Sequence, residues 1–258
     1  MIIKSMFKRS LLHYHLFLIK LGCRYFYSWY FNLKYFPWTI AKRLPFVFYK
    51  NAYAKICGKG KIVLTDSFIK GNKHVFFGQD IKDFDYQCEK SYLQLEGCLT
   101  VDGDVTVRRG AVMHVYGDMF IEDQVVVCSR TRITVHNSVK LGYNTRVAHE
   151  VQIFDTNFHP TKDVSNGQCY PISKPIIIGR NCWIGNRTTI NKGTILPDNT
   201  TVASNSLVSK DYSDLAPYSL IGGIPAKLLK NNYSIVWDAK LENECKTREF
   251  EWYRLRQK

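Results

Sequence analysis

Residues 176–211 read IIIGRNCWIGNRTTINKGTILPDNTTVASNSLVSKD, and aliphatic side chains recur in this stretch every six positions. The spacing extends back to residue 101, and its members are Val101, Val107, Met113, Ile121, Val127, Ile133, Leu141, Val147, Ile153, Ile178, Ile184, Ile190, Leu196, Val202 and Val208. A period of six matches neither the 3.6-residue helix nor the two-residue strand, but it fits a short strand followed by a tight corner. The pattern predicts an all-β solenoid whose stacked coils bury one aliphatic column.

Three strands and three corners would make one triangular coil, because the early triplets begin 20 residues apart and the later ones 18. Corners require left-handed or otherwise open backbone angles, which glycine and asparagine tolerate best. The candidate corner residues are Gly142, Gly179, Gly185, Asn181, Asn186, Asn199 and Asn205. An antiparallel sandwich is the competing interpretation, and the many positions that share one register argue against it.

The repeat is interrupted once, by residues 154–177, FDTNFHPTKDVSNGQCYPISKPII. Loops on rigid scaffolds commonly carry binding and catalytic residues, so this loop is the candidate functional segment. His159 can exchange a proton near neutral pH. Asp155 lies four residues earlier and could fix the tautomer of that imidazole. From spacing alone, a structural histidine is the competing interpretation.

These segments resemble the hexapeptide-repeat acyltransferases, and most closely the sugar O-acetyltransferases of the maltose and galactoside type. The motifs that support the resemblance are His159-Pro160, KPI at residues 174–176, where the chain returns from the loop to the repeat, and WIG at residues 183–185. The resemblance covers residues 95–230 and implies a left-handed parallel β-helix. It also implies that His159 is the general base that takes the proton of an acceptor hydroxyl as this oxygen attacks the thioester of acetyl-CoA.

The resemblance also implies contacts for coenzyme A along a groove beside the coils. The matching positions in this chain are Asn186, Ser204, Lys210, Lys227 and Lys230. Asn186 departs from the small residue that is common at its position, which leaves a backbone contact as its expected role. For each lysine alone, a solvated surface charge is the competing interpretation.

The expected function is an acetyl-CoA-dependent O-acetyltransferase that modifies a sugar in a bacterial cell-surface saccharide, such as an O-antigen, a capsule or an exopolysaccharide. An N-acetyltransferase of an amino sugar or sugar nucleotide is the alternative that the sequence leaves open. Relatives form homotrimers with the active site between two subunits, so the resemblance implies a trimer. Tyr143 and Asn144, in the coil before the loop, are the candidates for acceptor binding.

The net charge of +14 is concentrated near the N-terminus, where residues 1–65 hold 12 Lys and Arg and no Asp or Glu. Residues 1–50 also contain 15 aromatic residues, a mixture that suits an anionic lipid headgroup layer. Packing on the solenoid or on a neighbouring subunit is the equally weighted alternative. Because the rest of the chain is nearly neutral and carries no groove-entering motif, no nucleic-acid partner is expected.

The eight cysteines contain no CxxC pair, so neither a zinc site nor a disulfide framework is predicted. Carbonic anhydrases use a similar β-helix with three histidines around zinc, and His114, His136 and His149 raise that alternative. These histidines are predicted to be corner or surface residues, and no metal is expected. A non-enzymatic scaffold is the remaining alternative, and the intact loop argues against it.

The sequence predicts three regions. Residues 1–60 form a mostly helical, basic and aromatic segment, residues 61–212 form the β-helix with its loop at 154–177, and residues 213–258 form a closing segment with a C-terminal helix. The chain lacks a run of 18 apolar residues, so no membrane-spanning helix is predicted. A cytoplasmic location, peripheral on the inner face of the membrane, is the expectation.

Overall fold

The computed structural model describes residues 23–80 and 89–256. Residues 1–22 of the predicted membrane-surface segment lie outside these ranges. Within them, no helix is both long and apolar enough to cross a membrane.

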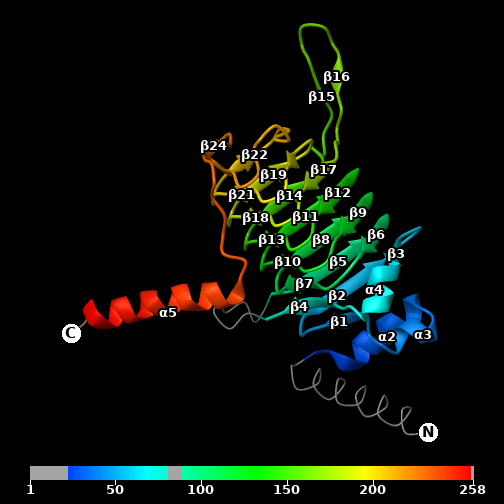
Figure 1. The fold of residues 1–258 in the computed structure, drawn as a ribbon. Helices are drawn as coiled ribbons and strands as arrows, with labels where there is room; N and C mark the ends of the chain where they lie inside the picture. The colour runs from blue at the N-terminus through cyan, green and yellow to red at the C-terminus, as the bar shows by residue number, and fades with distance from the viewer. Residues whose placement is uncertain (1–22, 81–88, 257–258) are drawn as a thin grey trace.

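Three sheets, parallel except for the last strand of the first, form the sides of a prism (Figure 1). The first sheet contains β1 (Phe46–Phe48), β4 (Val75–Gln79), β7 (Val105–Arg108), β10 (Val125–Val127), β13 (Arg146–Val147), β18 (Trp183–Ile184), β21 (Thr201–Val202), β23 (Leu220–Gly222) and β24 (Lys227–Lys230). The second contains β2 (Ala52–Ile56), β5 (Ser91–Leu95), β8 (Val112–Val115), β11 (Arg132–Val135), β14 (Gln152–Phe154), β19 (Thr189–Asn191) and β22 (Leu207–Val208). The third contains β3 (Lys61–Leu64), β6 (Cys98–Val101), β9 (Asp118–Ile121), β12 (Ser138–Leu141), β17 (Ile176–Ile178) and β20 (Ile195–Leu196).

The hexapeptide positions stack in register through the prism. On the second sheet, for example, Met113 pairs with Ile133, Ile133 with Ile153, Ile153 with Ile190 and Ile190 with Val208. All of the predicted column positions are at most 2% exposed. The predicted left-handed parallel β-helix is therefore confirmed. Its core is one continuous aliphatic column, which the burial of apolar surface stabilises.

The corners are called first, second and third as the chain passes from the first sheet to the second, from the second to the third, and back to the first. The predicted corner asparagines with a left-handed backbone are Asn181, Asn199 and Asn205, with φ of 51°, 61° and 56°. Gly142 and Gly185 have a different reason to be glycine. A Cβ on Gly142 would lie 2.5 Å from the carbonyl carbon of Gly179, and one on Gly185 would lie 2.6 Å from the nitrogen of Ser204. Close approach of successive coils, rather than an unusual dihedral angle, therefore requires these two glycines.

The N-terminal helices cover the lower end of the prism. They are α2 (Tyr25–Tyr35) and α3 (Trp38–Ala41), and Phe31 of α2 packs its ring against Phe46 and Phe48 at centroid distances of 5.4 and 4.8 Å. The first coil begins at β1, before the predicted boundary at residue 61. Aromatic residues replace the aliphatic hexapeptide positions there, and a short helix, α4 (Asp66–Gly71), fills the corner after β3.

The β-helix also continues past residue 212, because β23 extends the first sheet and β24 then pairs with it antiparallel. The chain next runs back beside the first sheet, where the ring of Trp237 lies 4.9 Å from the guanidinium carbon of Arg146. The final helix, α5 (Ala239–Arg256), projects away from the coils (Figure 1).

Candidate active site

The interrupting loop is a hairpin that projects from the second corner, between β14 and β17 (Figure 1). Its outer part pairs β15 (Thr161–Lys162) antiparallel with β16 (Cys169–Tyr170). At its root, the amide of Asn157 donates to the carbonyl of Ile172 at 2.9 Å, and the ammonium of Lys192 donates to the same carbonyl at 3.2 Å. The root is therefore fixed to the solenoid by the next coil.

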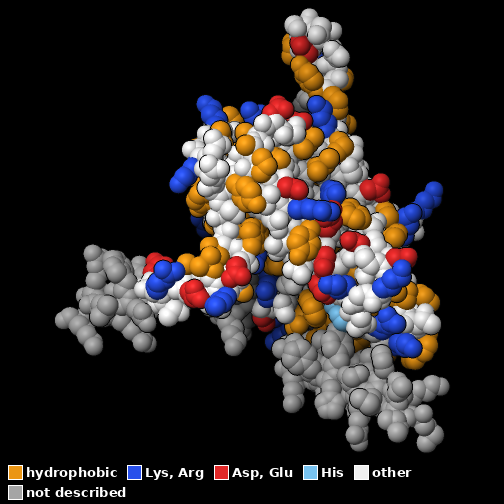
Figure 2. Space-filling model, viewed as in Figure 1, with side chains coloured by type: hydrophobic (Ala, Val, Ile, Leu, Met, Phe, Trp, Pro, Cys, Tyr) orange, Lys and Arg blue, Asp and Glu red, His pale blue; other side chains and the backbone are white. Residues whose placement is uncertain are grey.

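Apolar side chains along the hairpin face solvent (Figure 2). Val164 near the tip is 89% exposed, and Phe158, Tyr170 and Ile172 are between 43% and 52% exposed. Exposed apolar groups in this number are typical of a surface that contacts a ligand or another chain.

His159 sits at the root of this hairpin with an exposed side chain. Its amide donates to the carbonyl of Asn157 at 2.7 Å, and Phe158 between them has a φ of 62°. A hydrogen bond between residues two apart around a positive φ is the rare, strained form of γ-turn. Such strain in a non-glycine residue is concentrated at functional sites, because surrounding contacts must hold it. The turn presents the imidazole to solvent beside the last strand before the loop.

Asp155 does not make the predicted contact with His159. Its carboxylate is fully buried and accepts hydrogen bonds from the backbone amides of His136 and Asn137, each at 2.7 Å. Burial raises the pKa of Asp155, and these amide donors oppose that rise. The carboxylate is committed to the second corner of the preceding coil, so Asp155 supports the loop root rather than the tautomer of His159.

A line of rings, which we call the aromatic row, leads along the second sheet and its corner to the hairpin. The members are Tyr92, His114, Tyr116, His136, Phe158 and Phe154. Successive centroids lie 6.1, 6.4, 4.9 and 5.8 Å apart from Tyr92 to Phe158, and Phe158 lies 5.8 Å from Phe154. The row places Phe158, the neighbour of His159, in direct contact with the ring of His136.

Two of the predicted coenzyme A residues lie together on the first corner. The hydroxyl of Ser204 donates to the side-chain oxygen of Asn186 at 2.5 Å, although they are separated by one coil in sequence. Both are on the upper coils, beyond the level of the hairpin.

The predicted lysines are spread over the upper end. Lys210 follows β22 at the second corner, as the hairpin follows β14, and its ammonium lies 5.2 Å from the centroid of Tyr212. Lys227 and Lys230 begin and end β24, and both are exposed. The structure thus places Lys210 on the corner that carries His159, and the other two at the closing strand.

The predicted acceptor residues are not brought to His159 within one chain. Tyr143 and Asn144 lie on the third corner, whereas the hairpin leaves from the second. The amide of Tyr143 donates to Glu122 at 2.9 Å, and the side chain of Asn144 donates to that of Asn181 at 3.0 Å in a ladder of corner asparagines. The Asn144 side chain is thereby engaged in holding adjacent coils together.

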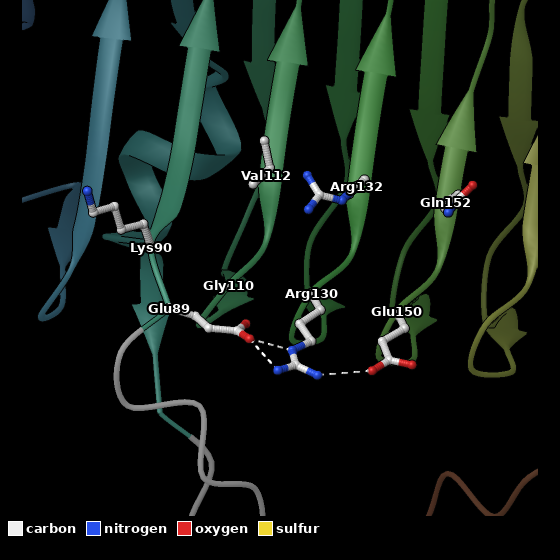
Figure 3. A pocket seen from close by; sticks show the side chains of 8 residues that line it. All are labelled: Glu89, Lys90, Gly110, Val112, Arg130, Arg132, Glu150 and Gln152. Atoms are coloured by element: carbon white, nitrogen blue, oxygen red, sulfur yellow. Dashed lines mark hydrogen bonds and ion pairs between the residues drawn. The ribbon is translucent and has the colours of Figure 1, made fainter.

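A pocket opens where the first corner meets the second sheet (Figure 3). Its lower rim is an ion-pair ladder in which Arg130 bridges Glu89 and Glu150, the latter at 3.3 Å. Arg132 on β11 lies above this ladder, between Val112 and Gln152 (Figure 3). Among the residues that the structure describes, the Arg132 side chain has no hydrogen-bond or ion-pair partner. The described residues also hold no group of three His, Cys, Asp or Glu side chains that could bind a metal ion.

Comparison with known proteins gives matches over the β-helix. The chain is 27% identical over 159 residues to WbbJ of Escherichia coli K12, a candidate lipopolysaccharide biosynthesis O-acetyl transferase, covering 57% of this chain and 80% of WbbJ. It is 34% identical over 95 residues to the galactoside O-acetyltransferase of the same strain, covering 36% of this chain and 44% of that enzyme. No protein-family model matches the chain.

The chain is thus similar to the hexapeptide-repeat acyltransferases, both in its coils and in the relatives that it matches. The coils supply the repeat that defines this family, and the matched relatives are acetyltransferases, so the protein is an acyltransferase. Among solved structures, the polysialic-acid-specific acetyltransferase NeuO matches 81% of this chain and 99% of its own, with 18% identity and a TM-score of 0.46.

Sequence reasoning missed Tyr116, His136 and Phe158 as parts of the site region. The sequence predicts His136 as a corner residue, and it does lie at a corner, but its ring also packs between those of Tyr116 and Phe158, tilted against the first and edge-to-face with the second. The available signal was the spacing, because Tyr116 and His136 are 20 residues apart and therefore occupy the same corner of successive coils.

Proposed function

We propose that this acyltransferase transfers an acetyl group from acetyl-CoA to a hydroxyl of a cell-surface saccharide. The observation that carries the proposal is the placement of His159, which a strained turn presents at the root of a hairpin fixed to the β-helix. The names of the matched relatives support the reaction class, since they include a galactoside and a polysialic acid O-acetyltransferase.

In the proposed mechanism, His159 acts as the general base. Its neutral ring nitrogen accepts the proton of the acceptor hydroxyl while that oxygen attacks the carbonyl carbon of the acetyl thioester. The tetrahedral intermediate then expels the thiolate of coenzyme A, which takes up the proton from the imidazolium. Positioned proton transfer of this kind contributes about 10²–10⁴-fold to the rate.

Acetyl-CoA would lie along the upper coils between the hairpin and the closing strand. The paired side chains of Asn186 and Ser204 offer polar contacts at one corner of these coils. Lys210, Lys227 and Lys230 supply cations at the same end, as the phosphates of the donor require. Because these residues occupy three parts of the prism, we propose that a complete donor site combines residues of two chains.

We propose that the chain assembles as a homotrimer, as its resemblance to the family implies, and that neighbouring chains complete the site. Tyr143 and Asn144 lie one corner away from the hairpin of their own chain, so the Tyr143 side chain would serve the acceptor only in a neighbouring chain's site. Sedimentation velocity tests the assembly. A monomer that retains full activity would contradict both the acceptor role of Tyr143 and Asn144 and the donor site shared between two chains.

We also propose that the N-terminal helices rest on the inner face of the membrane. Phe26, Tyr30 and Leu33 share one face of α2 and are 86%, 60% and 49% exposed. Trp38 of α3 is 62% exposed. Residues 1–65 contain 12 Lys and Arg and no acidic residue, so the segment that carries these exposed rings is strongly basic.

Acceptor-dependent release of free thiol from acetyl-CoA tests the function, with a panel of neutral sugars, acidic sugars, amino sugars and sugar nucleotides. The product is then analysed by NMR and by its sensitivity to mild alkali, because esters hydrolyse there and amides do not. An alkali-labile product confirms O-acetylation, and an alkali-stable one establishes the N-acetyltransferase alternative. Absence of thiol release and of coenzyme A binding with every acceptor would contradict the proposal.

A further inference from the structure

The aromatic row is a half-exposed surface that the fold itself does not require. The core column lies inside the prism, whereas these rings lie on its outside. Tyr116 is 39% exposed and Phe158 is 52% exposed, and the side chain of His136 is also exposed. Six rings in unbroken contact across successive coils, three of them exposed and three partly exposed, indicate a binding surface.

The row has the geometry of an extended ligand. Strands of neighbouring coils lie about 4.8 Å apart, so each coil advances the surface by a distance comparable to one sugar unit. Tyr116 and His136 occupy equivalent corners of two successive coils, and Phe158 continues the line into the hairpin. The line ends beside His159.

Polar groups border the rings on the same sheet. His114 on β8 pairs in register with Thr134 on β11, and Thr134 with Phe154 on β14. Two residues before Thr134, Arg132 projects from β11 into the pocket of Figure 3. Rings that offer apolar faces, next to a guanidinium, match the mixture of C–H faces and hydroxyls on a sugar chain.

We infer that the outer face of the second sheet binds an extended saccharide chain, with the aromatic row stacking successive sugar units and delivering one of them to His159. This inference rests on the proposed function and specifies its acceptor as an oligosaccharide rather than a free monosaccharide. Arg132 supplies a hydrogen-bond donor or a countercharge to the same chain.

A glycan array that spans mono- to octasaccharides of bacterial surface polymers tests the inference. The full chain carrying His159→Ala is labelled and applied without acetyl-CoA, so binding is measured whether or not transfer occurs. The signal is expected to rise with chain length in at least one polymer series. Adding Tyr116→Ala should weaken binding of the longer members roughly tenfold.

Phe120→Ala is the matched control, because Phe120 is a partly exposed ring on β9, one strand after Tyr116 but on the third sheet. It should leave the array signal unchanged. Equal signals for short and long chains, or equal binding by the Tyr116 and Phe120 variants, would overturn the inference. A change of oligomeric state in Tyr116→Ala would instead identify the row as a subunit interface and would also overturn it.

Failure of the inference is distinguishable from failure of the proposed function. If the wild-type enzyme acetylates monosaccharides as efficiently as long chains, the proposed reaction stands and the proposal of an extended acceptor fails. Conversely, length-dependent binding without thiol release from acetyl-CoA would support the saccharide-binding surface and contradict the proposed acetyl transfer.

Discussion

The buried carboxylate of Asp155 accepts a hydrogen bond of 2.7 Å from the backbone amide of His136 in the adjacent coil. The other oxygen of this carboxylate accepts a hydrogen bond from the backbone amide of Asn137 at the same distance. Asp155 therefore fixes the corner that carries the His136 ring, and it stands at the start of the segment that carries His159. The same contact connects the last coil before the hairpin with the aromatic row.

Asp155→Asn should reduce stability, because an amide side chain can accept only one of the two backbone hydrogen bonds and leaves the other buried amide unpaired. The expected loss is about 1–3 kcal/mol in the free energy of unfolding. Urea unfolding measures it, with Asp163→Asn in the exposed hairpin turn as the control. A loss of activity without any loss of stability would instead restore Asp155 as a catalytic partner.

Glu122 provides a pH-dependent contribution to stability. Burial raises the pKa of this carboxyl, but Lys140, the amide of Tyr143 and Arg180 outweigh burial and hold its pKa below the usual value. A depressed folded-state pKa contributes stability that is present above the unfolded pKa and is lost as the pH falls through the folded one.

Glu122→Gln should therefore lower the free energy of unfolding at pH 7 by about 1–3 kcal/mol. The difference from wild type should shrink below about pH 4, where the carboxyl is protonated in both states. Urea titrations between neutral and acidic pH measure it, with the exposed Glu96→Gln as control. A difference that stays constant with pH would show that charge is not the cause.

Alanine usually gives a more stable protein than glycine at the same position, and the turn at Phe158 predicts the opposite order of stability there. A left-handed backbone costs an alanine about 1–2 kcal/mol and a glycine almost nothing. Phe158→Gly should therefore be more stable than Phe158→Ala by about 1 kcal/mol, although both lose the ring.

The same pair of substitutions at Phe154, within β14, is the control, and there alanine should be the more stable. Thermal unfolding of the four variants measures both orders. If alanine were the more stable residue at both positions, the strained turn that presents His159 would be refuted.

The coils from residue 101 onward are predictable because each core position obeys one local rule, a buried aliphatic residue every six positions. The first coil is not, because Phe46 and Phe48 replace the aliphatic residues and Phe31 of α2 packs against both rings. The regular spacing is therefore lost at the end of the core that a helix, rather than another coil, covers.

The candidate site was predictable in its location but not in its contacts. The break in the repeat identifies the hairpin, since only an insertion can interrupt a stacked coil. Proximity in sequence suggested that Asp155 would pair with His159, yet the partners of Asp155 lie one coil away. In a solenoid, residues 18 to 20 positions apart are nearest neighbours, and contacts of this kind are invisible to local motif reasoning.

Membrane contact through α2 predicts binding to anionic vesicles. The full chain should sediment with phosphatidylglycerol vesicles, and less with neutral phosphatidylcholine or at high salt. Phe26→Ser should reduce the bound fraction several-fold, whereas Val164→Ser, which removes an equally exposed apolar side chain from the hairpin, should not. Equal losses in both variants would contradict a specific role of α2.

The most direct test of the central claim is the rate of acetyl transfer by His159→Ala with the best acceptor at saturation. The account predicts a fall in kcat of about 10²-fold or more with unchanged thermal stability, because only the base is removed. Lys162→Ala in the same hairpin should keep the wild-type rate. A His159→Ala enzyme that turns over at the wild-type rate would contradict the account.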